Sequence, residues 1–205
     1  MKRKILVATT NPGKVAELRA MLDLNVEWVG LSDFPNIQEI EEDGKTFAEN
    51  ARKKALGYAG QTGLWTIADD SGLVVDALQG QPGVKSARFS GAKDKDRTLL
   101  DHKNMAKVLK LLDATPGEKR TARFWCCLCL ASPEKILIET EGKLEGVIAE
   151  KEMGTNGFGY DPIFFVPGLN KTVAQLTSEE KNVISHRGSA IGKLKPLLKQ
   201  FLENI

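Results

Sequence analysis

The stretch TTNPGK, at residues 9–14, has the composition of a phosphate-binding turn between a strand and a helix. The N-terminus of a helix presents unpaired N–H groups and a partial positive charge, which favour an anion, and the lysine adds a full positive charge. The spacing is not that of a P-loop, because Ala8 and Val15 stand where glycine and a hydroxyl residue are required. An ordinary strand–turn–helix with a solvated lysine is the alternative interpretation. The candidate phosphate-binding residues are Thr9, Thr10, Asn11, Pro12, Gly13 and Lys14.

The stretch IADDSGL, at residues 67–73, places two carboxylates directly after an apolar segment. Asp69 and Asp70 would repel each other, and burial would raise their pKa values, whereas a divalent cation removes both problems. Mg²⁺ prefers one or two carboxylates together with substrate phosphates. Because successive side chains of a strand alternate between faces, we expect only one of the two to point fully into a site. A turn with solvated acids is the alternative.

Two further stretches supply groups that suit a nucleotide base. In GTNGFGYDPIFF, at residues 154–165, Phe158 and Tyr160 could stack on a flat ring, and Asp161 could accept hydrogen bonds from ring N–H groups. In EEKNVISHRGSA, at residues 179–190, three donors lie within a few residues. Packed structural segments are the alternative for both stretches. The three donors are Lys181, His186 and Arg187.

The bulk composition excludes several classes of protein. The chain has 205 residues, of which 41% are hydrophobic and 27% charged, as in ordinary globular proteins of one large or two-lobed domain. The net charge of +2, without a long basic run, argues against a nucleic-acid partner. The apolar run near the N-terminus is too short for a signal peptide, and no stretch is long enough to span a membrane. We therefore expect a cytoplasmic protein without a membrane partner.

The three cysteines favour packing over metal binding. Cys126, Cys127 and Cys129 have C-C-x-C spacing, which differs from the C-x-x-C of zinc or redox sites. Adjacent residues of a strand point to opposite faces, so the first two cannot readily share a ligand. We therefore interpret them as buried thiols in an apolar strand.

The periodicity of apolar residues predicts an α/β fold with a mixed, twisted sheet flanked by helices. Helices are expected at residues 14–22 and 97–112, after Thr46 and Thr177 as N-caps, and at the C-terminal end, where Pro196 should kink or break the helix. A meander in the middle of the chain argues against a purely parallel sheet. Strands are expected at residues 4–8, 26–31, 64–68, 73–76, 123–131, 136–141, 144–149 and 162–166.

Five motifs, in this order, resemble those of the HAM1 or inosine-triphosphatase family. They are TTNPGK, GKTFAENARKKA, ADDSGLVVDALQGQPGVKSARFSG, GFGYDPIF and EEKNVISHRG. The resemblance covers residues 5–194 and implies hydrolysis of ITP, dITP and XTP to the monophosphate and pyrophosphate, which cleanses the nucleotide pool. It also implies a Mg²⁺ requirement, a homodimer, and a single domain over residues 1–205 with two lobes around a central nucleotide-binding cleft.

The resemblance also implies roles for individual residues. Asp70 matches the catalytic acid that also contacts the metal, and Ser71 matches a substrate contact. Glu41 aligns with an acidic metal ligand, with Glu42 and Asp43 as adjacent alternatives. The remaining matches are to substrate-contacting positions: Lys54 near the phosphates, and Phe158, Gly159, Tyr160, Asp161, Lys181, His186 and Arg187.

Two other functions fit parts of the pattern. Maf-type nucleotide pyrophosphatases also release pyrophosphate, but they begin with an arginine-bearing turn that TTNPGK fits poorly. A non-catalytic nucleotide sensor would keep a base pocket and a phosphate turn but would not need the acidic residues Glu41 and Asp70. A panel of substrates, assayed with and without Mg²⁺, separates these alternatives.

Overall fold

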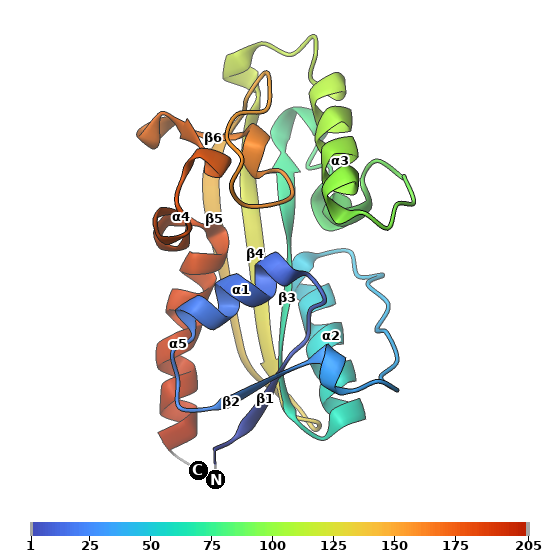
Figure 1. Cartoon of the computed structure of the whole chain (residues 1–205), viewed down its shortest axis with the longest axis vertical. Helices are drawn as coiled ribbons and strands as arrows, with labels where there is room; N and C mark the ends of the chain where they lie inside the picture. Colours follow the sequence, from blue (N-terminus) through green and yellow to red (C-terminus); the bar gives the residue numbers. More distant parts are fainter. Residues whose placement is uncertain (1, 204–205) are drawn as a thin grey trace. The chain divides into compact units, whose positions relative to one another are not determined.

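Seven strands form one mixed sheet in a computed structural model of the protein, which describes residues 2–203 (Figure 1). The order across the sheet is β2-β1-β3-β4-β5-β6-β7. β1 pairs in parallel with β2 and β3, whereas β6 pairs antiparallel with β5 and β7. The mixed α/β sheet expected from the sequence is thus confirmed. The strands are β1 (Lys4–Val7), β2 (Glu27–Gly30), β3 (Trp65–Val75), β4 (Thr121–Ala131), β5 (Ile136–Ile148), β6 (Phe164–Val166) and β7 (Lys171–Thr172).

Four α-helices of the described residues begin after a polar N-cap residue. Thr46 accepts a hydrogen bond from the Glu49 N–H at the start of α2, and Thr177 and Glu180 form the expected capping box of α4. Short 3₁₀ turns connect other elements. The helices are α1 (Pro12–Met21), α2 (Phe47–Thr62), α3 (Arg97–Leu111), α4 (Ser178–Ile184) and α5 (His186–Glu203).

The chain divides into two compact units, each assembled from separate segments. Unit 1 comprises residues 2–70, 126–142 and 186–203 of the described chain, and unit 2 comprises residues 71–125 and 143–185. β3, β4 and β5 each contribute residues to both units.

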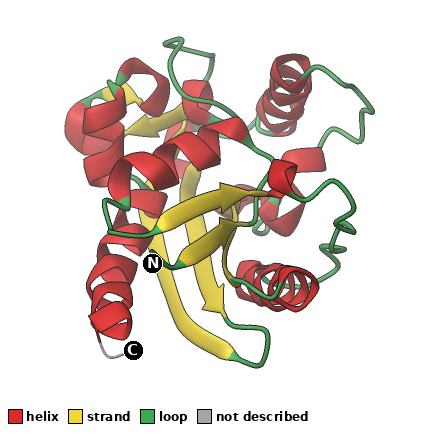
Figure 2. Ribbon diagram, turned by 60° about the horizontal axis from the view of Figure 1, so that its bottom comes forward, coloured by secondary structure: helices red, strands yellow, loops and turns green. Residues whose placement is uncertain are grey.

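Unit 1 has a core formed by α1 and α5 against its strands. Leu18 and Leu22 from the α1 segment pack with Ile191, Leu194 and other apolar residues of α5 and of β1, β3 and β4. Figures 1 and 2 show α1 and α5 close together, and Figure 1 shows α2 across the strands from α5. Four apolar residues of α2 recur at helical spacing and are buried: Phe47, Ala51, Ala55 and Tyr58.

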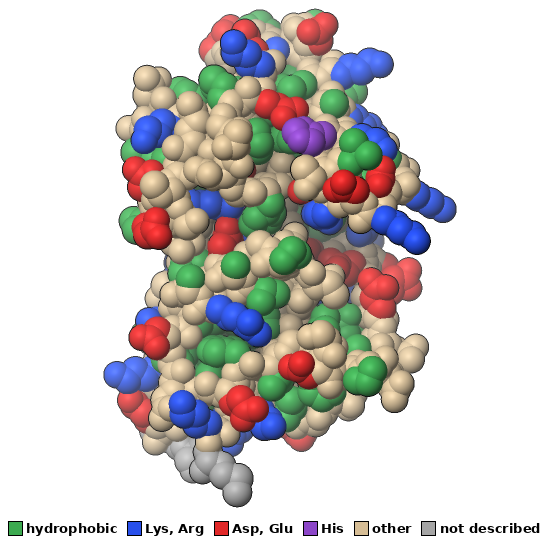
Figure 3. Space-filling view, in the orientation of Figure 1, with side chains coloured by type: hydrophobic (Ala, Val, Ile, Leu, Met, Phe, Trp, Pro, Cys, Tyr) green, Lys and Arg blue, Asp and Glu red, His purple; other side chains and the backbone are tan. Residues whose placement is uncertain are grey.

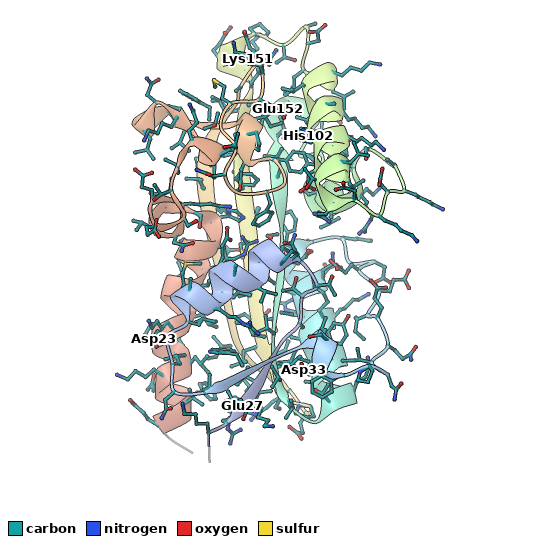
Figure 4. All side chains as sticks on the ribbon, in the orientation of Figure 1. Asp23, Glu27, Asp33, His102, Lys151 and Glu152 are labelled. Carbon is teal, nitrogen blue, oxygen red and sulfur yellow. The ribbon has the colours of Figure 1, made fainter. Side chains whose placement is uncertain are left out.

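Unit 2 has its own core, in which α3 packs on the strand segments of that unit. Met105 and Val108 of α3 join Phe124, Phe164 and other buried residues of β3, β4, β5 and β6. The rings of Phe124 and Phe164 stack with centroids 4.3 Å apart. On the outer side of α3, His102 lies 3.1 Å from the carboxylate of Glu152 (Figure 4).

Two strands continue through glycines at which the sequence predicted turns. β3 passes through Asp69 to Gly72 without interruption, and β5 passes through Gly142. A Cβ at Gly72 would lie 2.2 Å from Ser86 Oγ, and a Cβ at Gly142 would lie 2.1 Å from the His186 carbonyl. Each glycine therefore marks a close approach of another segment to the strand, and the turn prediction was wrong at both positions.

The C-terminal helix also differs from expectation. α5 runs from His186 to Glu203 with Pro196 inside it, so the proline does not end the helix. Ile191 and Leu194 are buried before the proline and Leu198 after it. Burial on both sides outweighs the loss of one backbone hydrogen bond, because tertiary packing supplies most of the stability of helices in proteins.

Candidate active site

The turn after β1 is built as the sequence predicted, but its helix begins two residues earlier. Asn11 is the N-cap of α1, and its side-chain oxygen accepts hydrogen bonds from the N–H groups of Gly13 (3.0 Å) and Lys14 (3.3 Å). Thr9 Oγ1 accepts one from the Asn11 N–H at 3.2 Å, and Thr10 is exposed. Asn11 therefore pairs with two of the helix N–H groups that an anion was expected to bind. The side chain of Lys14 is consequently the main positive group that this turn presents to an anion.

The topology of unit 1 favours a ligand site at this turn. β1 lies between β2 and β3, and the chain reaches these neighbours through α1 and α2 respectively. The strand order reverses here, because the chain passes from β1 to β2 on one side and then returns past β1 to β3, and such a reversal creates a crevice at the carboxyl ends of the strands. Because β3 is longer than β1, Asp69 and Asp70 lie within β3 and directly after its pairing with the end of β1.

Asp69 is fully buried at the centre of an ion-pair network. Its Oδ1 accepts a hydrogen bond from Lys14 Nζ at 2.5 Å, and its Oδ2 accepts from Arg187 Nε at 2.7 Å and from the Cys126 thiol at 3.2 Å. Arg187 Nη1 also pairs with Glu17. Burial alone would raise the pKa of Asp69, but Arg187 and Lys14 hold it well below its usual value.

Asp70 has a different environment, although it is the next residue along the strand. Its Oδ2 accepts a hydrogen bond from Asn50 Nδ2 at 3.0 Å, and its Oδ1 lies 3.6 Å from Lys54 Nζ. Burial raises the pKa of Asp70 to about 6, against the opposing effect of Lys54 and Lys14 and with a smaller contribution from Glu42. The pair thus separates into an ionised structural carboxylate and a carboxylate that can exchange a proton near neutral pH, a pattern typical of acid–base sites.

Lys54 brings the acidic segment before α2 into the same site. Its Nζ donates to the backbone carbonyl of Asp69 at 2.7 Å and lies 3.1 Å from Glu42 Oε2. Glu41 is exposed, and Asp43 forms an exposed ion pair with Lys53. Of the three acidic residues considered from the sequence, Glu42 is therefore the one whose carboxylate approaches Asp70.

A pocket of about 1120 Å³ opens within unit 1 beside these groups. Its polar wall includes Thr9, Thr10, Glu42 and Lys54. Its apolar wall comes from α1, α2 and the segment after β2, including Val15, Leu31, Phe34, Pro35, Ile37, Ile40 and Tyr58. The pocket is as large as the larger small-molecule sites found in proteins.

Unit 2 holds the second group of predicted residues together. Asp161 Oδ2 accepts hydrogen bonds from the Phe158 N–H at 2.9 Å and from Lys181 Nζ at 2.6 Å. Lys181 Nζ also lies 4.4 Å from the centre of the Phe158 ring. Gly159 donates its N–H to Asp101, and the buried Tyr160 donates its hydroxyl to the Ser86 carbonyl. The result is a half-buried aromatic ring fixed beside a buried ammonium group.

The third predicted motif divides between the units. Lys181 lies on α4 in unit 2, whereas His186 and Arg187 begin α5 in unit 1, and all three are buried. Ser71, the residue after the catalytic candidate Asp70, is half-buried and is the first residue of unit 2. The three cysteines are buried as expected, and burial raises the pKa of each thiol.

Sequence reasoning did not assign the positions that four side chains have in unit 1: Glu17, Asn50, Asp69 as a buried anchor, and Glu42, which it considered only as an alternative to Glu41. Asn50 and Lys54 are four residues apart, so the helical period of α2 places them on one face with buried apolar residues. A buried polar pair on an otherwise apolar face was the available signal for Asn50. The other three depend on contacts between distant segments, which no local pattern reveals.

The chain is similar to known proteins over nearly its whole length. The model of the Ham1 family matches residues 5–197. A dITP/XTP pyrophosphatase of Geobacter sulfurreducens is 51% identical over 193 residues, covering 94% of each chain, and one of Bacillus cereus is 50% identical over 204 residues, covering 97% of this chain and 96% of the relative. The solved structure of a HAM1 protein from Coxiella burnetii matches with a TM-score of 0.86 at 40% identity, over 97% of this chain and 99% of the other. This chain belongs to the Ham1 family.

Proposed function

We propose that this protein hydrolyses non-standard purine nucleoside triphosphates, namely ITP, dITP and XTP, to the monophosphate and pyrophosphate. The relatives named dITP/XTP pyrophosphatase support this reaction, because each aligns over nearly the whole chain. The observation that carries the proposal is the pair of adjacent carboxylates Asp69 and Asp70, held beside Lys14 and Lys54 at the turn after β1.

The triphosphate is assigned to unit 1. Lys14 and Lys54 are the two ammonium groups at the site, and both are largely buried, so their interaction with phosphate oxygens is less screened than at an exposed surface. Thr9, Thr10 and Pro12 line the adjoining pocket. Lys14 is already paired with a carboxylate, but an ammonium group has three donors and can keep that bond while donating to phosphate.

We also propose that Asp70 and Glu42 hold a divalent cation, with Mg²⁺ as the expected ion. Two carboxylates gather around one ammonium group, and the pKa of Asp70 is raised, so the site gains from an additional cation. Within residues 2–203, no cluster of three or more His, Cys, Asp and Glu side chains forms a self-sufficient metal site, which suits an ion completed by substrate phosphates.

The charges at the site also favour a cation that arrives with the substrate. Three cationic side chains lie among four carboxylates, so the site as it stands has no excess positive charge for a polyphosphate. These residues are Lys14, Lys54 and Arg187, with Glu17, Glu42, Asp69 and Asp70.

Asp70 is assigned as the catalytic base. Its carboxylate is held by Asn50 and lies near Lys54, so it is fixed in place to take a proton from a water molecule. A bound Mg²⁺ would neutralise charge on the phosphates. Lys14 and Lys54 hold the triphosphate for in-line attack of the water on the α-phosphorus, so that pyrophosphate leaves; positioning and charge stabilisation contribute most in such transfers.

The purine base is assigned to unit 2. The Phe158 ring provides a stacking surface, and Lys181 provides a donor fixed by Asp161. A 6-oxo purine presents an acceptor at C6, which suits such a donor, whereas adenine presents an amino group there. The mismatch with adenine leaves buried groups unpaired, at a cost of about 1–3 kcal/mol for each. Ser71, Gly159, Tyr160, His186 and Arg187 are proposed as further substrate contacts.

The remaining features of the proposal concern the assembly and its surroundings. We propose a homodimer that acts in the cytoplasm on free nucleotides and has no nucleic-acid or membrane partner. On the face shown in Figure 3, acidic and basic side chains are interspersed, in keeping with the net charge of +2. Within the described residues, none of the helices has the length and apolar character required to cross a membrane.

A pyrophosphate-release assay tests the function directly. ITP, dITP and XTP should be hydrolysed with Mg²⁺ and not with EDTA, and at much higher kcat/KM than GTP or ATP. Release of pyrophosphate from pyrimidine or modified nucleotides in preference to ITP would contradict the proposal. Binding of ITP without any turnover would point instead to a nucleotide sensor.

A further inference from the structure

Asp69 joins four separate elements of unit 1 through one carboxylate group. Its oxygen atoms accept from Lys14 on α1, from Cys126 on β4 and from Arg187 on α5, while Asp69 itself belongs to β3. The side chain has no solvent exposure, and that of Arg187 is 1% exposed. A carboxylate so fully surrounded by donors has no oxygen directed to solvent, so it is unsuited to binding substrate itself.

The contact with Lys14 fixes a side chain that would otherwise be mobile. A lysine has a flexible four-carbon stem and loses considerable conformational freedom when it is held in one place. In this structure the ammonium group is bound to Asp69 at 2.5 Å, and the lysine side chain is only 14% exposed. Asp69 therefore orders the ammonium group in advance of any phosphate.

The backbone of the same residue fixes a second lysine. Lys54 Nζ donates to the Asp69 carbonyl at 2.7 Å, so both ammonium groups of the proposed triphosphate site are oriented by one residue. Because the carbonyl belongs to the main chain, a substitution of the Asp69 side chain retains this second contact. The effect of the side chain can therefore be tested through Lys14 alone.

We propose that Asp69 is a positioning residue for the triphosphate, acting through Lys14 and not by contact with the substrate. The proposal rests on the proposed function, because it concerns the binding of the same nucleotide. Arg187 has the complementary task of holding Asp69 in place, with Glu17 on its other side. The network thus supports one phosphate-binding ammonium group through the buried carboxylate of Asp69, which the substrate does not touch.

A double-mutant cycle tests this assignment. Asp69→Asn and Lys14→Met should each lower kcat/KM for ITP by about 10–100-fold, mainly through KM, because the triphosphate is no longer held in register. In the double variant, Asp69→Asn should change kcat/KM by less than about threefold relative to Lys14→Met alone. Multiplicative effects of the two substitutions would overturn the proposal. Absence of activity in the unmodified protein would instead refute the proposed function.

Inorganic triphosphate provides a readout that a purely structural role would not change. It carries the phosphates without the base, so its inhibition constant should rise in Asp69→Asn and Lys14→Met to the same extent. An unchanged inhibition constant in Asp69→Asn, with Lys14→Met affected, would contradict the assignment.

Glu139→Gln is the matched control, because it removes a carboxylate from an exposed ion pair of unit 1, with Arg52, without touching Lys14. This variant should retain kcat/KM within about threefold and should leave inhibition by triphosphate unchanged. If Asp69→Asn alone fails to fold, the same cycle is measured in an Arg187→Gln background, in which no buried guanidinium is left without its carboxylate. Independence of the two substitutions there would overturn the proposal equally.

Discussion

Asp69 and Asp70 show how two identical neighbours acquire different chemistry from their partners. The β-strand alternation directs one carboxylate to Lys14 and Arg187 and the other to Asn50 and Lys54. Two formal cations keep the first ionised, whereas burial dominates for the second and raises its pKa to about 6. The different partners of the two carboxylates support the proposed catalytic role of Asp70.

Replacement of the proposed base should abolish turnover without abolishing binding. Asp70→Asn keeps the size of the side chain and the hydrogen bond from Asn50, but it cannot accept a proton, so kcat for ITP should fall by about 10²–10⁴-fold. Isothermal titration should show ITP affinity within about tenfold of the unmodified protein. Asp76→Asn, which alters a surface ion pair with Arg123, is the matched control and should keep kcat. Near-normal kcat in Asp70→Asn would remove Asp70 from the catalytic role.

The same substitution should stabilise the metal-free protein. The pKa of Asp70 is raised from 3.8 to about 6 on folding, so the native state binds the extra proton between these values and stability falls as pH rises through them. The ionised carboxylate therefore costs up to about 3 kcal/mol near pH 7.5, a cost that asparagine avoids. Urea unfolding in EDTA should show Asp70→Asn to be the more stable protein near pH 7.5, with the difference shrinking near pH 4. A difference that does not depend on pH would refute this explanation.

At the residue scale, the sequence predicted the charged side chains that are proposed to meet the substrate but not those that hold them in place. Lys14, Lys54 and Asp70 were identified from motifs and lie within one site. Glu41 was aligned with the metal-binding acid, whereas Glu42 is the neighbour that approaches Lys54. One position along an irregular segment decides which carboxylate faces inward, and no periodicity fixes that choice.

At the scale of elements, glycines within strands hold other segments close to the sheet. Gly142 of β5 lies against the start of α5, where a Cβ would come within 2.1 Å of the His186 carbonyl and 2.6 Å of the Ala190 N–H group. The sequence predicted that the chain turns at both Gly72 and Gly142, because glycine ends strands more often than it continues them. The requirement for a close approach is set by a segment that is distant in the sequence. Only the folded structure therefore distinguishes a glycine that ends a strand from a glycine that lets another segment lie against the strand.

Addition of one methyl group at this contact should displace the start of α5. Gly142→Ala should lower the free energy of unfolding by about 1–3 kcal/mol, because backbone atoms of the helix must move to admit the Cβ. Gly60→Ala is the matched control: it lies within α2 with no atom within 4 Å of the added Cβ and should be neutral or stabilising by about 0.4–1 kcal/mol. Urea unfolding of both variants provides the comparison. Equal stability of the two would show that α5 does not depend on the close approach.

At the scale of the whole molecule, the sequence motifs belong to two different units. Local sequence patterns do not show where one unit ends and the other begins. The sequence predicted the order and type of most elements and the mixed sheet. It did not show that β3, β4 and β5 supply residues to two cores, because the hydrophobic pattern of a long buried strand does not change where one core gives way to the other. The proposed phosphate residues and base residues consequently belong to different units, Lys14 and Asp70 to unit 1 and Phe158 and Lys181 to unit 2.

Ligand-linked stability tests the combined proposal for the intact chain. A non-hydrolysable ITP analogue with a methylene group between the α- and β-phosphorus atoms should bind the native state only. At a concentration 100 times its Kd, it should add about 2.7 kcal/mol to the free energy of unfolding, which corresponds to a rise in Tm of about 5–10 °C for a chain of this length. EDTA should abolish most of the rise, because the polyphosphate meets four carboxylates and only three cationic side chains at the unit 1 site when the divalent ion is removed. The corresponding ATP analogue, at the same concentration with Mg²⁺, should raise Tm much less, since its 6-amino group cannot accept the hydrogen bond from Lys181.

An equal rise in Tm with both analogues would refute base selection by unit 2 while leaving the phosphate site intact. A rise in Tm that survives EDTA would refute the proposed role of the divalent cation.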